Sequence, residues 1–149
     1  MAHDFVRFPE LTAKEMEIYY FESPHKQIVD DIRVRCVKVH DGDTIRVRWQ
    51  ERNFDFPVRF ADIQAPELSD GKTGEDSRDY LERRILNQEL ELKIDPKNRV
   101  EKWGRLLARV YFMGMNIADE MIFMGHAVDW AHKDDGKIIN GIKLPKEFA

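Results

Sequence analysis

The stretch HDGDTIRV, which runs from His40 to Val47, places two carboxylates on either side of a glycine. Asp-Gly between apolar alternations is a strong signal for a β-hairpin turn, because glycine accepts the positive φ that a tight turn needs. A turn explains Asp41 and Gly42, but it does not explain Asp43, which falls at the start of the next strand, where aspartate is disfavoured. Carboxylates also bind hard cations such as Ca²⁺. Two interpretations of Asp43 are therefore open, a turn residue or a metal ligand.

Two further segments carry charged residues at predicted strand ends. In VRFADIQAPEL, Arg59 has the opposite parity to the phenylalanines, so its side chain should point away from what they bury, and Glu67 follows where the chain leaves the sheet. In EKWGRLLARVY, Gly104 predicts a turn and Arg105 begins a strand. Taken singly, the two arginines are equally explained as exposed sheet charges, Glu67 as a solvated loop acid, and Trp103 as an aromatic cover for the end of a barrel.

The hydrophobic pattern predicts the elements that position these segments. Apolar residues alternate in five stretches, which predict strands at residues 32–39, 45–49, 54–63, 90–94 and 106–112. The first three are consecutive and should form a meander. Within the first stretch the apolar parity changes between Cys36 and Val37, which predicts a β-bulge.

Three helices are predicted around these strands. Thr12 and Glu15 form a capping box at the start of a short N-terminal helix. Residues 75–88 carry one apolar stripe amid charge, as an amphipathic helix does, and Asn116 can cap a helix over residues 117–124.

The expected fold class is mainly β with helices (α+β). Five short strands, with one helix between the third and fourth and another after the fifth, predict a five-stranded OB-fold barrel with an extra N-terminal helix. The expected organisation is an N-terminal extension over residues 1–30, a barrel domain over residues 31–132 and a coil tail over residues 133–149.

Composition limits the classes of protein that remain. The 149 residues are 42% hydrophobic, enough for one globular domain with a real core. Charged residues make up 35%, but the formal net charge is −4, which excludes a polybasic protein, so any phosphate binding must be local. The single cysteine, Cys36, cannot form an intramolecular disulfide and fits a reducing compartment. Without a long apolar run or a secretory signal, we expect a cytoplasmic monomer that does not contact membranes, unless a signal was removed.

In combination, the segments resemble the staphylococcal nuclease (thermonuclease) family. DGDT, then R-x7-E within VRFADIQAPE, then a helix, then KWGR before a strand match the family's motifs in order and spacing. The resemblance extends over roughly Val34 to Trp130 and favours the metal-ligand interpretation of Asp43. It implies an OB-fold enzyme that needs Ca²⁺ and cuts DNA or RNA.

The resemblance also implies a metal site. Asp43 matches a calcium-ligating aspartate of the family. The family's second calcium-binding aspartate falls at Gln64, and the backbone carbonyl that a threonine normally supplies falls at Ala65. Gln64 keeps an amide oxygen but removes one negative charge, which predicts weaker calcium binding or a changed metal preference.

The catalytic and substrate-binding roles are implied in the same way. Arg59 and Arg105 match the arginines that grip the scissile phosphate, a task suited to a planar, always charged donor. Glu67 matches the glutamate that orients or deprotonates the attacking water, and Lys102 and Trp103 stand where a lysine and a tyrosine flank the bound nucleotide.

Two functions from different classes follow. The first is a calcium-dependent nuclease that acts on DNA or RNA and, by family analogy, leaves 3′-phosphates. The alternative is a nuclease-like OB module that binds nucleic acid or protein without cutting. Gln64 and the negative net charge favour the alternative, whereas the joint retention of the other four catalytic and metal-binding residues favours the enzyme: Asp43, Arg59, Glu67 and Arg105.

Overall fold

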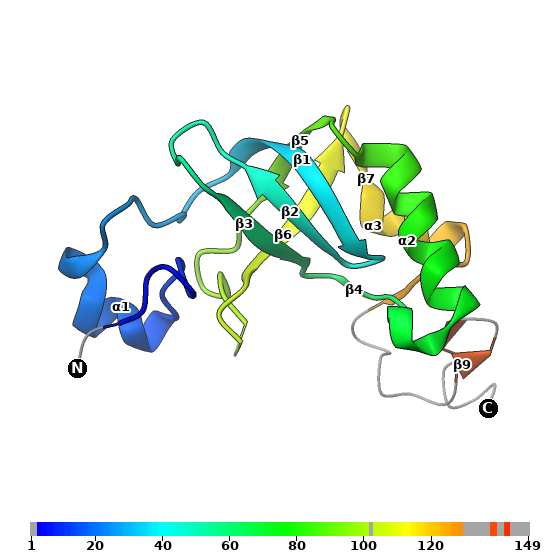
Figure 1. Ribbon diagram of the computed structural model, residues 1–149, viewed down its shortest axis with the longest axis horizontal. Coiled ribbons are helices and arrows are strands. Elements are labelled where there is room, and N and C mark those ends of the chain that lie inside the picture. The colour runs from blue at the N-terminus through cyan, green and yellow to red at the C-terminus, as the bar shows by residue number, and fades with distance from the viewer. Residues whose placement is uncertain (1–2, 102, 130–137, 140–141, 144–149) are drawn as a thin grey trace.

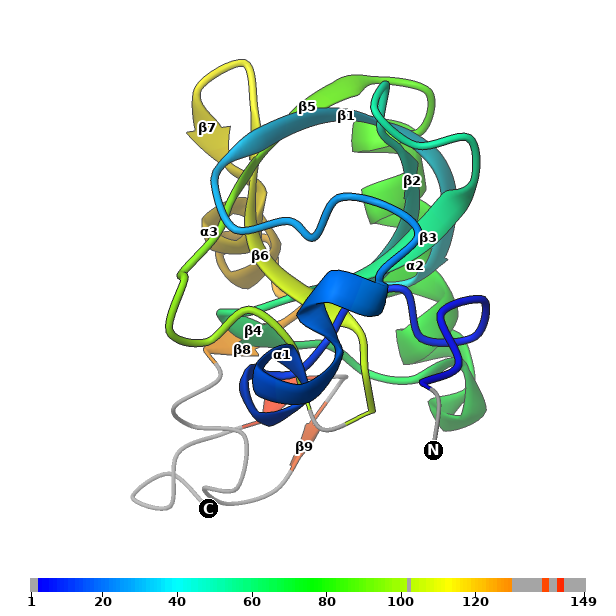
Figure 2. The same cartoon turned by 90° about the vertical axis from the view of Figure 1, so that its left-hand side faces the viewer.

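The computed structural model describes residues 3–101, 103–129, 138–139 and 142–143 (Figure 1). Its largest sheet contains the five predicted strands in the predicted order: β1 (Ile32–Asp41), β2 (Thr44–Arg48), β3 (Asp55–Phe60), β5 (Glu89–Lys93) and β6 (Leu106–Phe112). β1, β2 and β3 form the expected antiparallel meander, and β5 pairs with both β1 and β6. In space the five strands lie in the order β3-β2-β1-β5-β6. β6 also pairs in parallel with β3, so the first and last strands of this order meet and close a ring. Figure 2 looks into that ring, so the predicted OB-fold barrel is confirmed.

Short strands extend this framework. β7 (Met115–Asn116) pairs with the end of β6, and β4 (Ile63–Gln64) pairs with β8 (Val128–Asp129). β9 (Ile138–Ile139) and β10 (Ile142–Lys143) pair with each other, so the expectation of coil throughout residues 133–149 is wrong at these positions. Each of these strands is only two residues long, too short for an alternating pattern to be recognised in the sequence.

The helices begin largely where their caps predict. α1 (Ala13–Tyr19) starts after Thr12, whose side chain accepts from the Glu15 N–H while the Glu15 side chain accepts from the Thr12 N–H. It continues into the single turn η1 (Tyr20–Glu22). α3 (Ile117–Phe123) starts after Asn116, whose side chain accepts from the Asp119 N–H.

α2 (Lys72–Ile85) begins and ends three residues before the predicted helix at 75–88. Its start follows the single turn η2 (Leu68–Asp70) through Gly71, whose φ of +81° glycine adopts without strain. Its end comes where Leu86 becomes extended and Asn87 takes a positive φ of 64°, which turns the chain into β5.

The barrel core is apolar and α2 covers one side of it. The residues of α2 that are buried are Gly74, Ser77, Leu81 and Ile85, and this stripe packs against β1. β1 carries the predicted bulge, because its register with β2 shifts between Cys36 and Lys38. A second shift, between Val39 and Asp41, brings the strand into the β1–β2 turn.

The N-terminal segment is anchored to the barrel by buried charges. Glu10 is 1% exposed and forms ion pairs with Arg52 and Arg99, which are also buried. Arg99 additionally donates through Nη2 to the Leu11 carbonyl at 2.8 Å and through Nη1 to the Ile28 carbonyl. Among the described residues, no helix has the length and apolar character needed to cross a membrane.

Candidate active site

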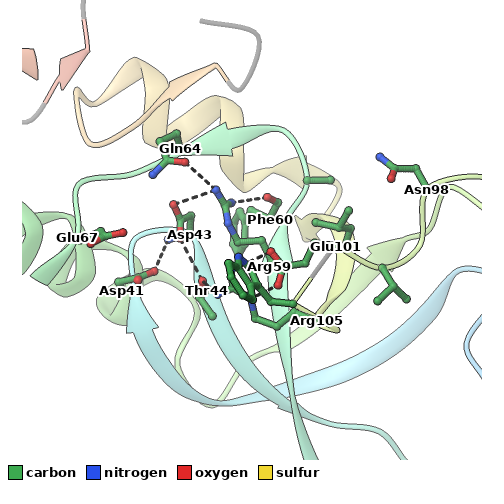
Figure 3. Close-up of a pocket in the computed structure, with 14 residues that line it drawn as sticks. Asp41, Asp43, Thr44, Arg59, Phe60, Gln64, Glu67, Asn98, Glu101 and Arg105 are labelled. Carbon is green, nitrogen blue, oxygen red and sulfur yellow. Dashed lines mark hydrogen bonds and ion pairs between the residues drawn. The ribbon is translucent and has the colours of Figure 1, made fainter. Parts of the chain in front are cut away.

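A cavity of about 660 Å³ opens where the β1–β2 turn, the end of β3 and the loop between β5 and β6 meet. We call it the reaction cavity (Figure 3). It brings together six of the predicted site residues from distant parts of the chain: Asp43, Arg59, Gln64, Glu67, Trp103 and Arg105. Ala65 is not among the lining residues, and Lys102 lies outside the described residues.

The β1–β2 turn consists of Gly42 and Asp43. Neither has a positive φ, so the expected reason for the glycine is wrong. A Cβ on Gly42 would collide with the Oγ of Ser77 and lie 2.7 Å from the Cβ of Ala65. Glycine is needed here because the turn packs directly against α2 and against the residue that follows β4.

Asp43 is a buried carboxylate, only 6% exposed. Its Oδ2 accepts from the Ala65 N–H at 2.8 Å and lies 3.4 Å from Nη2 of Arg59, and its Oδ1 accepts from the Thr44 hydroxyl at 3.1 Å. Burial raises the pKa of Asp43 to about 7, although Arg59 acts in the opposite direction; the nearby Asp41 carboxylate raises it further. The carboxylate is therefore only partly compensated by its protein partners.

Arg59 is 5% exposed, which overturns the interpretation of this residue as an exposed sheet charge. It points away from the phenylalanines as expected, but the chain folds back over that face of β3. Nη1 donates to the carbonyls of Phe60 at 2.6 Å and Ile63 at 2.8 Å, and Nη2 donates to Oε1 of Gln64 at 3.1 Å. Burial lowers the pKa of Arg59, which Asp43 partly counteracts. The guanidinium is thus held in one orientation at the cavity wall.

Gln64 connects Arg59 to the backbone of Ala65. Its Oε1 accepts from Arg59, and its Nε2 donates to the Ala65 carbonyl at 3.4 Å. The Ala65 N–H donates to the Asp43 carboxylate. The two residues proposed as metal ligands therefore lie beside Asp43, but the oxygen of each already accepts a hydrogen bond from the protein.

Arg105 is held by a carboxylate that the sequence motifs did not single out. Its Nε and Nη2 donate to the two oxygens of Glu101 at 2.6 and 3.0 Å, and this pairing raises the pKa of Arg105. Nη1 donates to the Thr44 hydroxyl at 3.3 Å. Trp103, 65% exposed, lines the cavity from the same loop. A carboxylate four residues before the arginine, in EKWGR, was the available signal for Glu101.

Glu67 is exposed, on a backbone that is firmly positioned. Its N–H donates to Oδ2 of Asp70 at 2.8 Å, and its own side chain accepts from the Ser69 hydroxyl at 3.4 Å. A Cβ on Gly74 would collide with the carbonyl oxygen of Glu67, so this glycine lets α2 pack against the loop. The result is a carboxylate that reaches the cavity from a fixed loop.

Asp41 also lines the reaction cavity. The sequence pattern explains this residue only as part of the β-hairpin turn. Its Oδ1 accepts from the Asp43 N–H at 3.1 Å. Within the described part of the chain, no group of three or more His, Cys, Asp or Glu side chains could hold a metal ion. Any cation bound here would therefore rely on two carboxylates, Asp41 and Asp43, together with neutral oxygens and water.

Comparison with known proteins gives consistent matches. The family model described as "Staphylococcal nuclease homologue" matches residues 57–141. The SPbeta prophage-derived endonuclease YokF of Bacillus subtilis (strain 168) is 32% identical over 130 residues, which cover 83% of this chain and 42% of YokF. Endonuclease YncB of the same strain is 27% identical over 124 residues, covering 79% of this chain and 58% of YncB.

A third relative is an uncharacterized endonuclease of Haemophilus influenzae (strain ATCC 51907 / DSM 11121 / KW20 / Rd). It is 36% identical over 99 residues, which cover 66% of this chain and 52% of the relative. The chain thus spans about half the length of these relatives.

Proposed function

Because the chain belongs to the staphylococcal nuclease homologue family, we propose that it is a nuclease that hydrolyses phosphodiester bonds of DNA or RNA. The printed names of three relatives, all endonucleases, support this proposal. The observation that carries it is the convergence of two arginines and four carboxylates on one cavity, one of the carboxylates being Glu101, which pairs with Arg105. In Figure 3 the carboxylates of Asp41, Asp43 and Glu67 lie to one side of Arg59 and Arg105.

In this proposal, the arginines bind the scissile phosphate. Guanidinium groups carry paired donors that match phosphate oxygens, and donors fixed before the reaction stabilise the charge that develops in the transition state. Arg59 is fixed by the carbonyls of Phe60 and Ile63, and Arg105 by Glu101. Because Glu101 occupies Nε and Nη2 of Arg105, Nη1 is the donor most available to a phosphate oxygen.

Glu67 would act on the attacking water. Its carboxylate is exposed to the cavity, so it can accept a proton from a water that lies between it and a phosphate held by the arginines. The water would attack the phosphorus on the side opposite the 5′ oxygen. The bond between the phosphorus and the 5′ oxygen then breaks, and that oxygen takes up a proton from solvent and leaves as a 5′ hydroxyl. The product then has a 3′-phosphate, as the family resemblance implies.

A calcium ion fits the chemistry of the oxygen donors around Asp41 and Asp43. Asp41 and Asp43 are neighbouring carboxylates, and the raised pKa of Asp43 reflects a negative charge that its partners compensate only in part. These two would hold the ion, with Gln64 Oε1 and the Ala65 carbonyl as neutral oxygens, each of which has a second lone pair beside the hydrogen bond that it already accepts. When bound, the ion would polarise the phosphate and lower the pKa of a coordinated water.

The second candidate is an OB module that binds nucleic acid without cutting it. Two observations favour it: an amide stands at position 64, and Arg105 is already paired with Glu101. The exposed Glu67 favours the enzyme, because nucleic-acid binding alone has no use for a carboxylate that faces a phosphate site.

The test is a cleavage assay with single-stranded DNA and RNA in millimolar Ca²⁺, repeated with excess chelator and with Mg²⁺ or Mn²⁺. We expect cleavage in Ca²⁺ that stops with chelator, since a site with few carboxylates binds calcium only modestly. End-group analysis should find 3′-phosphates. Binding without cleavage under every divalent ion would favour the binding module, and cleavage in chelator would exclude the calcium requirement.

A further inference from the structure

A second cavity adjoins the reaction cavity along the outer face of β6. It has a volume of about 200 Å³, and three of its lining residues, Ala61, Asn98 and Leu107, also line the reaction cavity. The two hollows are therefore neighbours with a common wall. The side chains that distinguish the second cavity include two cations, Lys93 and Arg109.

Lys93 and Arg109 face each other directly across the β5–β6 ladder. Both are exposed, and like charges opposite each other destabilise an antiparallel pair. In the part of the chain that the structure describes, neither forms an ion pair with a carboxylate. A bound anion between the two cations would remove this repulsion.

The nearby carboxylates do not cancel the two cations. Asp95 lines the same cavity, and its Oδ1 accepts from the Lys97 N–H at 3.0 Å. Asp62 attracts Arg109 electrostatically, but it is half-buried and its Oδ2 accepts from Nδ2 of Asn116 at 3.4 Å.

The position of Arg109 relative to the reaction cavity suits an extended strand. Arg59 pairs with Leu107 in the β3–β6 ladder, and Arg109 lies two residues further on the same face of β6, or ~7 Å along it. Beyond it on that face is Tyr111, whose ring lies 4.5 Å from Nζ of Lys93. A line of cationic and aromatic side chains is how proteins follow single-stranded nucleic acid.

We propose that Lys93 and Arg109 bind the phosphodiester that adjoins the scissile one in a single-stranded substrate. The proposal rests on the proposed nuclease function, because it extends the same substrate path by about one nucleotide. It also places two cations beside the reaction cavity of a chain whose net charge is −4.

The test compares Lys93→Gln, Arg109→Gln and the double variant with Arg83→Gln. Arg83 is exposed on α2 and lines neither cavity, so its replacement makes the same charge change as either single variant, but elsewhere on the protein. Binding of a fluorescent single-stranded dodecanucleotide is measured by anisotropy in chelator at several salt concentrations. This measurement does not depend on cleavage.

We expect the double variant to bind the dodecanucleotide ~10-fold more weakly at low salt. Its salt slope should be shallower by ~0.7, because one phosphate of the strand is no longer neutralised by the protein. The decrease in affinity should be larger for the dodecanucleotide than for a dinucleotide, which has a single phosphodiester. The double variant should melt close to the parent, because the change removes the repulsion between the two cations as well as the contact of Lys93 with the Tyr111 ring.

Decreases in dodecanucleotide affinity for Lys93→Gln and Arg109→Gln that are no larger than the decrease for Arg83→Gln would overturn the proposal. So would an equal decrease for the dinucleotide, since that would place the two cations at the scissile phosphate itself. A protein that binds as expected but never cleaves would refute the nuclease function and leave this phosphate site supported.

Discussion

Arg59 and Arg105 carry the same functional group in different surroundings. Arg59 is buried and bonded to two backbone carbonyls, whereas Arg105 is partly exposed and paired with Glu101 from its own loop. Removing the first guanidinium leaves buried carbonyls without a donor, and removing the second leaves an accessible carboxylate. The two arginines should therefore differ in what they contribute to folding, even if both bind phosphate.

Replacing either arginine by lysine should lower turnover by at least ~10²-fold, because an ammonium cannot keep the protein contacts that orient the guanidinium and also donate to the phosphate. Arg59→Lys should also lower the free energy of unfolding by ~1–3 kcal/mol, since buried acceptors lose their partner. Arg105→Lys should change stability little. Turnover and chemical denaturation of both variants check this, and near-normal turnover of either lysine variant would remove that arginine from the proposed mechanism.

Gln64→Asp should strengthen calcium binding if the ion lies beside Asp43. An additional carboxylate at position 64 should raise the affinity for Ca²⁺ by ~10-fold, equivalent to ~1.4 kcal/mol. The measurement is the melting temperature of both proteins across a Ca²⁺ titration, because a ligand of the folded state raises it as ligand concentration increases.

The parent protein is the control for Gln64→Asp. Without a metal, the new carboxylate adds repulsion near Asp43 that Arg59, already paired with Asp43, offsets only in part, so the variant should melt lower in chelator and recover in Ca²⁺. If the melting temperatures of both proteins do not change with Ca²⁺ concentration, the HDGDTIRV stretch is a hairpin turn and not a metal site.

For single residues, the sequence motifs predicted which side chains meet in the cavity better than they predicted the surroundings of each side chain. The types at 43, 59, 67 and 105 were identifiable, and the structure brings them to one cavity. The burial of Arg59 was not, because it depends on the chain between β3 and β4 folding over it. Glu101 was missed because its importance lies in its pairing with Arg105.

The N-terminal segment supports the loop that carries Arg105. Arg99, in that loop, is bonded to the carbonyls of Leu11 and Ile28 and paired with Glu10. A Cβ on Gly104 would lie 2.9 Å from the Phe8 ring, so the segment also packs against the turn before Arg105. The capping box that begins α1 was evident from the sequence, but this long-range role of the segment was not.

Glu10→Gln should therefore destabilise the protein and loosen the loop. It leaves Arg52 and Arg99 buried without their carboxylate, which should cost ~3–5 kcal/mol. We also expect faster amide exchange in the loop between β5 and β6. Glu17→Gln, an exposed change on α1, is the matched control, and equal melting temperatures for the two variants would show that Glu10 does not anchor the segment.

The molecule as a whole closes through contacts that local patterns do not encode. Alternation predicted the five strands and the bulge after Cys36, yet the parallel pairing of β3 with β6 joins segments far apart in sequence. The strand pair in the tail escaped prediction because each strand is only two residues long. Local preference is a weak guide for such short elements.

The reactivity of the Cys36 thiol measures how often the protein opens enough to expose its core. It is fully buried, and burial raises the pKa of its thiol to about 11. Alkylation at pH 8 should therefore be very slow in the native protein, because the reactive thiolate is both scarce and inaccessible. The same reagent in denaturant is the control. Rapid labelling of the native protein would mean that α2 opens away from β1 without global unfolding.

The Thr44 hydroxyl joins the two halves of the reaction cavity. It donates its single proton to Asp43 and accepts from Arg105, so it lies between the carboxylate side and a phosphate-binding donor. A ligand that reorients either partner also changes the hydrogen bond available to the other. Cation and nucleotide would then bind with heterotropic cooperativity, and thermodynamic reciprocity requires each to change the affinity for the other by the same factor.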